Sequence, residues 1–369
     1  MIQDWTSQKA VNTTADDTLT LALHVLTSAG FGSSYSFKGD AQLPSGHQMS
    51  YRDALATVLR GIIPIFIIPH ALFSLPFAPR SAKQLGLAIK EFKSYMGEMV
   101  EGERSRMNKR DPGTGNLMSS LIHASDQAKE NALTDHEIYG NTFIYNVAGH
   151  ETTAHTLAYG INLLAAFPHY QNWLHEELLR VIGDKDPASL DYDETFPKLK
   201  RCLAIMYETL RSYGPTASLP KYTNDKSQPL TIAGKQYIIP PHVIVHLNQA
   251  AVQTHPKYWG PRCLEWLPDR WIDTNNDIDT MKDPPGGRGT FLPWADGARN
   301  CPGKKFSQVE FVAVLATIFR EWQVRPATLE GESIKQARER VLGVVNDSHV
   351  VLTLAMKRPE SVELVWSKR

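Results

Sequence analysis

The longest regular element that the sequence predicts lies in residues 134–167. Thr134 and Glu137 have the spacing of a capping box, in which a hydroxyl and a carboxylate satisfy free amide groups at the start of a helix. Apolar and small residues then continue to Phe167, and Pro168 ends the run because the residue before a proline disfavours helix. A helix of about 30 residues is long for a globular protein. Since little charge interrupts its middle, we expect it to cross the core of a large, mainly helical protein.

The rest of the chain adds further helices and a few strands. Apolar periodicity predicts helices at residues 18–30, 51–63, 80–109, 170–181 and 304–322, with a loop at 111–115 and a helix that opens at Pro197. Strands are expected within residues 229–247, with a turn at Ala233 and Gly234, and at 350–356, with 362–366 as its pairing partner. The sum is a mainly α fold with a minor β component.

Composition is that of a globular chain with a large core, because 42% of the residues are hydrophobic and 21% are charged. Lysine plus arginine and aspartate plus glutamate both number 39, so the formal net charge is zero. Phosphate binding needs a basic excess, and we therefore expect no nucleic-acid partner. The three cysteines, Cys202, Cys263 and Cys301, are too few and odd in number for a disulfide framework, which favours a reducing compartment.

Residues 61–77 are the most apolar stretch of the chain. Pro64, Pro69 and Pro76 interrupt it, and it is shorter than the roughly 20 residues that span a bilayer. The first residues contain no apolar core that would mark a signal peptide or a membrane anchor. We favour a buried helix end followed by a loop, and contact with a membrane surface is the alternative.

The most informative short segment surrounds Cys301. Gly297 and Gly303 flank this cysteine, which comes just before a predicted helix start, where amide groups and the helix dipole stabilise a thiolate. Glycines let the backbone approach a flat ligand closely, and Arg299 can pair with a carboxylate on such a ligand. The alternative is a buried structural cysteine in a glycine-rich turn, which a cysteine taken alone would favour.

The spacing of Trp294, Gly297, Arg299, Cys301 and Gly303 resembles the haem-binding loop of cytochrome P-450 enzymes, here residues 291–303. That family has phenylalanine where this chain has Trp294, and an indole still shields the face of the sulfur. The resemblance implies haem b as cofactor, with Cys301 as the axial ligand of its iron and Arg299 directed at a haem propionate. Thiolate ligation pushes electron density toward O–O cleavage.

Three further motifs follow the order that this resemblance implies. Glu208 and Arg211 are three residues apart, so they share one face of the predicted helix and can pair. Alone, such a pair is common on surfaces and worth at most ~1 kcal/mol. The resemblance implies instead a buried ion pair that holds the fold around the haem, with Arg270 as its third member.

The second motif, Ala148 to Thr152, lies inside the long central helix. Gly149 costs a helix about 1 kcal/mol against alanine, and Thr152 can bond back to a carbonyl one turn earlier and open the helix locally. The resemblance implies an oxygen-binding groove in which Ala148 and Gly149 leave space over the iron and Glu151 with Thr152 relays protons. The alternative is a helix with a packing face of small residues.

The third motif is Lys221, which follows Leu219 and Pro220. The family has an arginine at this position, directed at a haem propionate, and lysine keeps the charge without the bidentate geometry. An ordinary loop is the alternative.

Over its length, the resemblance implies one cytochrome P-450 domain, residues 1–369. The family is longer, and Met1 falls after the family's first strands and helices. We therefore expect a chain that lacks the N-terminal strands and first helices of that fold, together with one wall of the haem pocket.

The function that follows from the resemblance is a haem-thiolate monooxygenase. It would insert one atom of O2 into an organic substrate, with electrons from an NADPH-dependent flavoprotein reductase, at the surface of the endoplasmic reticulum membrane. The second hypothesis is a truncated relative that folds poorly or binds haem without turnover. Neither fold nor haem chemistry names the substrate.

Overall fold

The computed structural model describes residues 1–34, 37, 43–69, 72–73, 75, 77–108, 115–125, 132–275 and 278–369. It divides into two compact units. The first consists of Met1 and Asp16–Ala154, and the second of Ile2–Ala15 and His155–Arg369. Each unit is described by itself below, and the expectation of a single domain stays a prediction.

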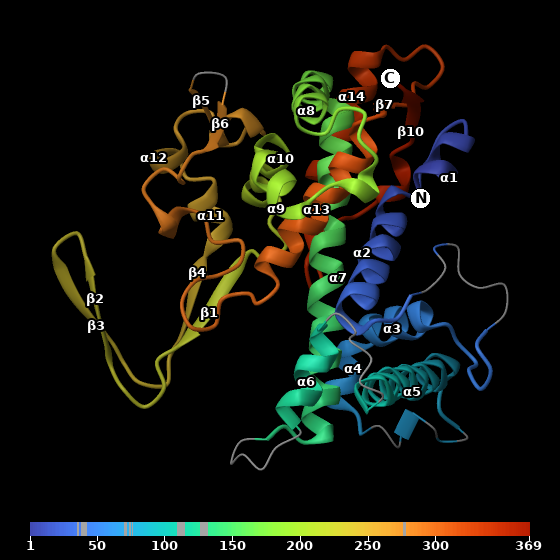
Figure 1. Ribbon diagram of the computed structural model, residues 1–369. Coiled ribbons are helices and arrows are strands. Elements are labelled where there is room, and N and C mark those ends of the chain that lie inside the picture. Colours follow the sequence, from blue (N-terminus) through green and yellow to red (C-terminus); the bar gives the residue numbers. More distant parts are fainter. Residues whose placement is uncertain are drawn as a thin grey trace. The chain divides into compact units, whose positions relative to one another are not determined.

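The first unit is helical. Its elements are α2 (Thr14–Phe31), α3 (Tyr51–Arg60), α4 (Ile62–Ile67), α5 (Arg80–Asn108), α6 (Leu117–Ser125) and the first part of α7 (Asp135–Ala166). Helix α3 lies along α5 (Figure 1). The helix predicted to run through residue 63 in fact ends at Arg60, because Gly61 caps α3 and α4 starts as a separate helix. Residues 111–114 of the predicted loop lie outside the described residues.

Most described side chains of the apolar segment 61–77 are not buried as we favoured, although Phe73 is. Ile63 and Ile67 of α4 are 67% and 74% exposed, and Phe77 is 83% exposed. Every position of α4 is apolar, so its residues cannot all face one side of the helix, and Ile63 and Ile67 remain in solvent. No helix within the described residues is both long and apolar enough to cross a membrane.

Helix α7 confirms the predicted central helix. The Glu137 amide donates to Thr134 Oγ1 at 3.3 Å and the Thr134 amide donates to Glu137 Oε2 at 2.8 Å, which is the predicted capping box. In the part that belongs to the second unit, Leu157, Ile161 and Leu164 are fully buried. This part of α7 therefore lies in the core of that unit.

The second unit contains the remaining helices, namely α1 (Ile2–Ser7), α8 (Pro168–Val181), α9 (Tyr192–Thr195), α10 (Lys200–Ser212), α11 (Gln249–Gln253), α12 (Pro256–Trp259), α13 (Lys304–Phe319) and α14 (Ile334–Asn346). Pro197 does not open α10, because a 3-10 turn at Phe196–Lys198 precedes it and Leu199 leaves the helical region. Helix α14 was not predicted, although Ser333 and Gln336 form a capping box at its start.

Five antiparallel two-stranded ladders make up the β structure of the described residues. They pair β1 (Ser218–Tyr222) with β4 (Ile244–Asn248), β2 (Gln228–Ile232) with β3 (Lys235–Ile239), β5 (Ile272–Asn275) with β6 (Ile278–Met281), β7 (Trp322–Pro326) with β10 (Leu364–Lys368), and β8 (Ser348–Val350) with β9 (Leu354–Met356). The predicted turn between β2 and β3 is confirmed, with positive φ at Ala233 and Gly234. The mainly α fold with minor β structure is confirmed.

One strand pairing was predicted wrongly. Residues 362–366 do not pair with 350–356, because β10 instead pairs with β7, whose Val324 faces Trp366 in the ladder. The 350–356 segment folds back on itself as the hairpin of β8 and β9. Trp366 also stacks on Trp5 of α1, with ring centroids 5.0 Å apart, so the end of the chain is fixed within this unit.

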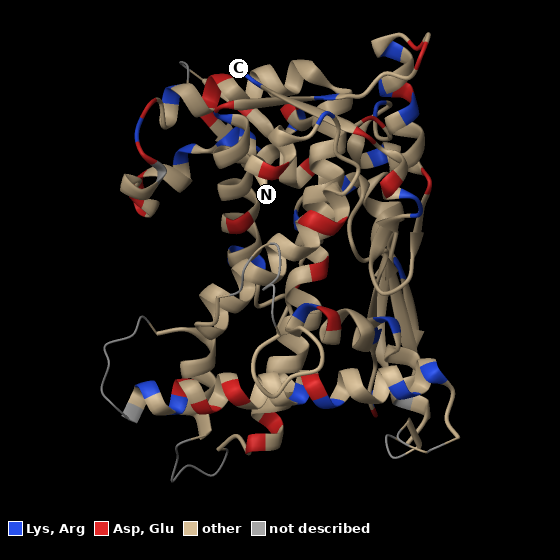
Figure 2. Ribbon diagram, turned by 90° about the vertical axis from the view of Figure 1, so that its right-hand side faces the viewer, with Lys and Arg blue, Asp and Glu red and all other residues tan. Residues whose placement is uncertain are grey.

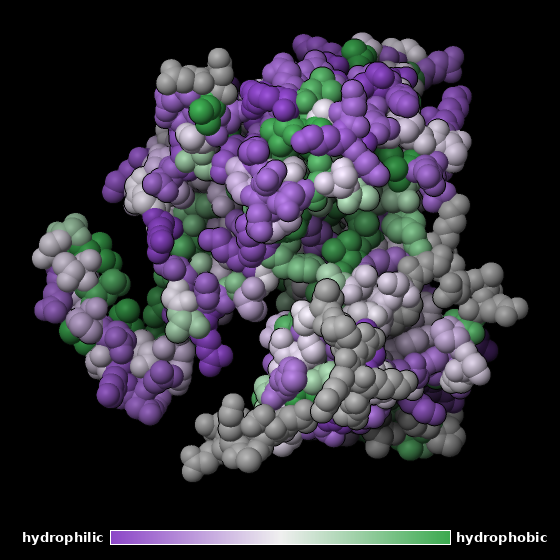
Figure 3. Space-filling model, in the orientation of Figure 1, coloured by the Kyte–Doolittle hydropathy of each residue, from purple (hydrophilic) through white to green (hydrophobic). Residues whose placement is uncertain are grey.

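The surface differs in character between elements. Acidic and basic residues are interspersed along the helices (Figure 2), in agreement with the zero net charge. The β2–β3 hairpin instead carries exposed apolar side chains (Figure 3), which are Leu230, Ile232, Tyr237 and Ile238.

Candidate functional site

The loop before α13 folds back on itself at Cys301. The Cys301 amide donates to the Trp294 carbonyl at 2.8 Å, and the Asn300 amide donates to the Gly297 carbonyl at 3.1 Å. Ala295 and Gly297 have φ values of +59° and +89°, which permits the reversal. The loop thus delivers Cys301 to the start of α13 through backbone contacts of its own.

Cys301 is exposed, whereas Cys202 and Cys263 are buried. The alternative of a buried structural cysteine is therefore wrong for Cys301. Gly303 is the N-cap of α13 and offers no side chain to the amides of the first turn. Uncapped amides and the positive end of the helix dipole favour an anion at this place, as predicted for a thiolate.

Trp294 lies against the first turn of α13 and against α10. Its indole Nε1 donates to Ser307 Oγ at 3.1 Å. The ring centroid of Trp294 is 5.7 Å from that of Tyr207 and 6.3 Å from that of Phe291. Burial raises the pKa of the Tyr207 hydroxyl, which accepts a hydrogen bond from Gln308. These aromatic side chains pack against one another and support the loop.

Two cations belong to the same loop region. Lys221 of β1 donates from Nζ to the Asp296 carbonyl at 3.3 Å, so the structure brings Lys221 to the cysteine loop. Arg299 is exposed, and no side chain or carbonyl among the described residues pairs with its guanidinium. Both can therefore meet an anionic group near Cys301.

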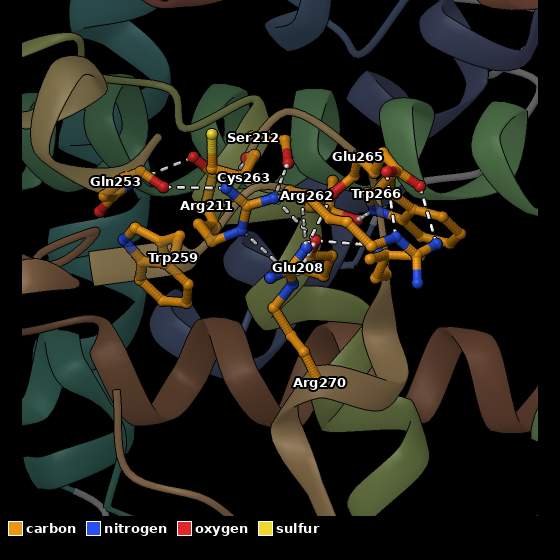
Figure 4. Close-up of polar contacts among 12 residues, drawn as sticks. Glu208, Arg211, Ser212, Gln253, Trp259, Arg262, Cys263, Glu265, Trp266 and Arg270 are labelled. Carbon is orange, nitrogen blue, oxygen red and sulfur yellow. Dashed lines mark hydrogen bonds and ion pairs between the residues drawn. The ribbon is translucent and has the colours of Figure 1, made fainter. Parts of the chain in front are cut away.

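Glu208 of α10 lies fully buried between Arg211 and Arg270 (Figure 4). Its carboxylate accepts from Arg211 Nε at 2.9 Å and Nη2 at 2.8 Å, and from Arg270 Nε at 3.1 Å. The Leu267 amide and the Trp271 indole donate to it as well, at 2.8 and 2.9 Å. Five donors thus surround one carboxylate, which satisfies both of its oxygens.

Arg211 is equally well satisfied. Its Nη1 donates to the carbonyls of Gln253 and Cys263 at 2.9 and 2.6 Å, and its Nη2 donates to the Glu265 carbonyl at 2.9 Å (Figure 4). The guanidinium also lies 5.1 Å from the ring centroid of Trp259. The pair therefore joins α10 to the segments that precede the cysteine loop.

Gln253 connects this cluster to the loop, and no sequence pattern had indicated it. Its Nε2 donates to the carbonyls of Leu210 and Arg211 at 3.1 and 3.2 Å, and its Oε1 accepts from the Leu292 amide at 3.0 Å. The side chain is buried. A glutamine in an irregular region carries no periodic or motif signal, so only the folded chain shows its role.

The Ala148–Thr152 segment lies in the first unit. Ala148 is exposed in the middle of α7, and Thr152 on the same face donates from Oγ1 to the Ala148 carbonyl at 2.9 Å, as expected. α7 nevertheless continues as an unbroken helix through this segment. A Cβ on Gly149 would approach the end of the Leu26 side chain of α2 to 3.0 Å, so the close packing of Leu26 also favours a glycine there. Glu151 follows on the next face, partly exposed.

The predicted site residues thus fall into two groups. The second unit brings together the cysteine loop, Lys221 and, through Gln253, the Glu208 cluster. The first unit holds the α7 segment with Glu151 and Thr152. In the second unit, the Cys301 sulfur is exposed at a helix start without a side-chain cap, and the Arg299 guanidinium of the same loop has no partner among the described residues. These features fit a haem with its iron and anionic propionates.

The chain matches the cytochrome P-450 family model over residues 1–351. It belongs to the cytochrome P-450 family. Among curated members, a cytochrome P-450 monooxygenase of Arthrobotrys oligospora is 31% identical, and the match covers 95% of this chain and 65% of that protein. The cytochrome P-450 monooxygenase prx9 of Penicillium rubens is 30% identical, over 100% of this chain and 67% of that protein. The chain thus spans about two thirds of the length of these relatives.

Solved cytochrome P-450 structures share the fold. A crystal structure of a cytochrome P-450 superposes with a TM-score of 0.75 at 19% identity, covering 100% of this chain and 75% of that chain. The cytochrome P450DA heme domain gives a TM-score of 0.72 at 22% identity, covering 100% and 70%. The resemblance inferred from the cysteine loop is therefore confirmed for family and fold, and family membership implies haem.

Proposed function

We propose that this chain is a haem-thiolate monooxygenase that converts a C–H bond of an organic substrate to C–OH. In the balanced reaction, one atom of O2 enters the substrate and the other leaves as water, with two protons and two electrons supplied. A flavoprotein reductase that oxidises NADPH is the proposed electron source. The observation that carries the proposal is the exposed Cys301 at the uncapped start of α13 in a chain of this family.

The cysteine loop supplies the proposed cofactor contacts. Bound haem b would supply an iron that activates O2, and the Cys301 thiolate would hold that iron. Trp294 would shield the sulfur, while Gly297 and Gly303 permit close approach of the backbone. Arg299 and Lys221 would each pair with a propionate, and the tether of Lys221 to the Asp296 carbonyl at 3.3 Å keeps its charge at the loop.

On α7, the proposed roles concern space and protons. Exposed Ala148 and small Gly149 would leave room for O2 and substrate. The Thr152 hydroxyl, oriented by its 2.9 Å hydrogen bond to the Ala148 carbonyl, would pass protons that Glu151 supplies. The Glu208, Arg211 and Arg270 cluster has no chemical step and serves as scaffold.

Coupling between NADPH oxidation and product formation tests the proposed proton path. Thr152→Ala should lower the product formed per NADPH several-fold, because α7 then lacks the hydroxyl that would pass protons to the reaction. Thr153→Ala is the matched control, since Thr153 is buried and bonds back to the Gly149 carbonyl at 3.5 Å. Unchanged coupling in Thr152→Ala would show that the proton path is wrong.

A second candidate function is haem binding without turnover. The observation that favours it is that the chain spans 65% and 67% of its two relatives described above. Haem retention with no product from any reductase, under conditions in which a longer relative turns over, would establish it. Product formation by this chain would exclude it.

We also propose that a membrane surface is a partner, at the endoplasmic reticulum as the family resemblance implies. The exposed Ile63 and Ile67 of α4 support the proposal, because isolated apolar side chains of this size gain by entering the lipid interface. Ile67→Asp should lower sedimentation with phosphatidylcholine vesicles several-fold. Leu230→Asp, an exposed apolar position on β2, is the control, and an equal loss in both variants would contradict a role of α4.

A further inference from the structure

The indole of Trp294 is held by the helix that follows the cysteine. Its Nε1–H donates to Ser307 Oγ at 3.1 Å, and the Ser307 hydroxyl donates to the Lys304 carbonyl at 3.0 Å. Because the hydroxyl hydrogen is used on that carbonyl, the oxygen is left to accept from the indole. The Lys304 ammonium lies 5.4 Å from the centroid of the same ring. The indole is therefore fixed in one orientation on the first turn of α13.

The Cys301 sulfur lies at the same helix start. The Cys301 amide donates to the Trp294 carbonyl at 2.8 Å, so these two residues face each other across the loop. The position of a Cβ on Gly303 would be 3.8 Å from the sulfur. The Trp294 N–H donor and a sulfur that becomes anionic as a ligand thus both lie at the start of α13, and the donor is already engaged with Ser307.

We propose that Ser307 is a positioning residue for the Cys301 ligand, because it holds the Trp294 N–H and keeps that donor away from the sulfur. The inference rests on the proposed function and deepens it. Hydrogen bonds to a ligating sulfur withdraw charge from it and set the reduction potential of the metal. Without an acceptor at position 307, the half-buried indole N–H loses its partner, and the thiolate is the anionic acceptor at this helix start.

The reduction potential of the haem-loaded chain tests this positioning role. Ser307→Ala frees the N–H, so the thiolate should donate less charge to iron and the potential should become more positive. At a fixed solution potential, the ratio of reduced to oxidised protein should rise about fivefold, which is the factor in an equilibrium constant that the free energy of one ordinary hydrogen bond produces. Iron–sulfur stretching, measured by resonance Raman, should fall in frequency in the same variant.

Matched substitutions separate the hydroxyl from the shape of the side chain. Ser307→Thr keeps the acceptor and should behave as the wild type. Ser307→Val has the shape of threonine without the hydroxyl, so it should behave as Ser307→Ala, and it replaces that variant if alanine impairs folding. Trp294→Phe removes the N–H, and Ser307→Ala added to Trp294→Phe should cause no further shift.

The outcomes distinguish this inference from the proposed function. A wild-type chain without a thiolate-type spectrum, after addition of haem, would contradict the proposed function and this inference with it. A wild-type thiolate spectrum with equal potentials in the threonine and valine variants would overturn the role of Ser307 alone. A shift that persists in the Trp294→Phe background would also overturn it, because no indole N–H is then present.

Discussion

Glu208 and Cys301 lie in the same unit, and the protein surrounds them in opposite ways. Glu208 is fully buried and accepts hydrogen bonds from five donors, with two guanidinium groups among them. Cys301 is exposed, its helix start carries no side-chain cap, and the nearby Arg299 has no partner among the described residues. The charged groups around Glu208 therefore find all their partners within the protein, whereas the groups around Cys301 can still bind a ligand.

The difference separates scaffold from binding site. A buried charge is tolerated only when its partners are present, so the Glu208 cluster has to be assembled whenever the unit is folded. An exposed sulfur has little effect on the free energy of unfolding, and its role begins only when a ligand binds. Substitutions in the first region should therefore act on stability, and substitutions in the second should act on haem binding.

The largest effect is expected for Glu208→Gln. The amide cannot neutralise Arg211 and Arg270, so the unfolding free energy should fall by about 3–5 kcal/mol in denaturant titration. Glu265→Gln is the matched control, because Glu265 forms an exposed pair with Arg262 at 2.8 Å with the same spacing of three residues. A loss in Glu208→Gln no larger than in Glu265→Gln would contradict the scaffold role.

Glu310 of α13 is a buried carboxylate without the hydrogen-bond donors that surround Glu208, and it tests how such burial affects stability. Both carboxylate oxygens lack a hydrogen-bond partner among the described residues, and burial raises the pKa to about 8. The folded state then holds a proton that the unfolded state releases near pH 4.5, so the unfolding free energy falls as pH rises from about 5 to 8. Glu310→Gln should remove its part of this slope and leave the part that Glu177 contributes, because burial raises the pKa of Glu177 to about 7. The unfolding free energy of Glu310→Gln should exceed that of the wild type at pH 8 by on the order of 3 kcal/mol.

The control for the pH dependence is Glu332. Its bonds to Arg340 lower its pKa to about 2, so its contribution is present above its ordinary pKa and lost only in more acidic solution. Glu332→Gln should therefore leave the slope between pH 5 and 8 unchanged. A slope as steep in Glu310→Gln as in the wild type would show that Glu310 does not contribute to it.

Gln253 sharpens the comparison because it joins the two regions. Gln253→Ala removes the hydrogen bonds to Leu210, Arg211 and Leu292, and the unfolding free energy should fall by about 2 kcal/mol. Haem affinity should fall as well, because the start of the cysteine loop is released. Gln171→Ala is the matched control, because Gln171 of α8 is an equally buried glutamine whose hydrogen bonds go to Leu164 and Val324, and it should leave haem affinity unchanged. Equal haem affinities in both variants would contradict the link.

The smallest effect on stability is expected for Cys301→Ala without haem. Because the side chain is exposed, the unfolding free energy should change by less than about 0.5 kcal/mol. Cys202→Ala should cost more, since Cys202 is fully buried in α10 and its loss leaves a void. A large destabilisation in Cys301→Ala would mean that the cysteine is structural after all.

Local signals in the sequence predicted local structure well. The capping box at Thr134 and Glu137, the turn at Ala233 and the three-residue spacing of Glu208 and Arg211 each specify their own geometry within one turn of chain. The capping residue Ser333 carried the same kind of signal for α14 and was overlooked.

Contacts between distant segments could not be predicted in the same way. Strand β10 pairs with β7 because the folded unit brings these two strands together. The alternation of apolar and polar residues in the sequence predicts a strand but does not identify its partner. Gln253 and Ser307 act through side-chain hydrogen bonds to residues far along the chain or across a loop, and neither residue type has a distinctive spacing. The candidate ligand was found from its motif, while its supporting contacts came from the structure.

The reduced, carbon-monoxide-bound absorption spectrum tests the central claim most directly. With haem added, the wild-type chain should show the red-shifted band of thiolate ligation, Cys301→Ala should lose it, and Cys202→Ala should keep it, because Cys202 is buried and Cys301 is exposed. A band that survives in Cys301→Ala, or that is absent from the folded wild-type chain, would contradict the assignment of Cys301 as the haem ligand.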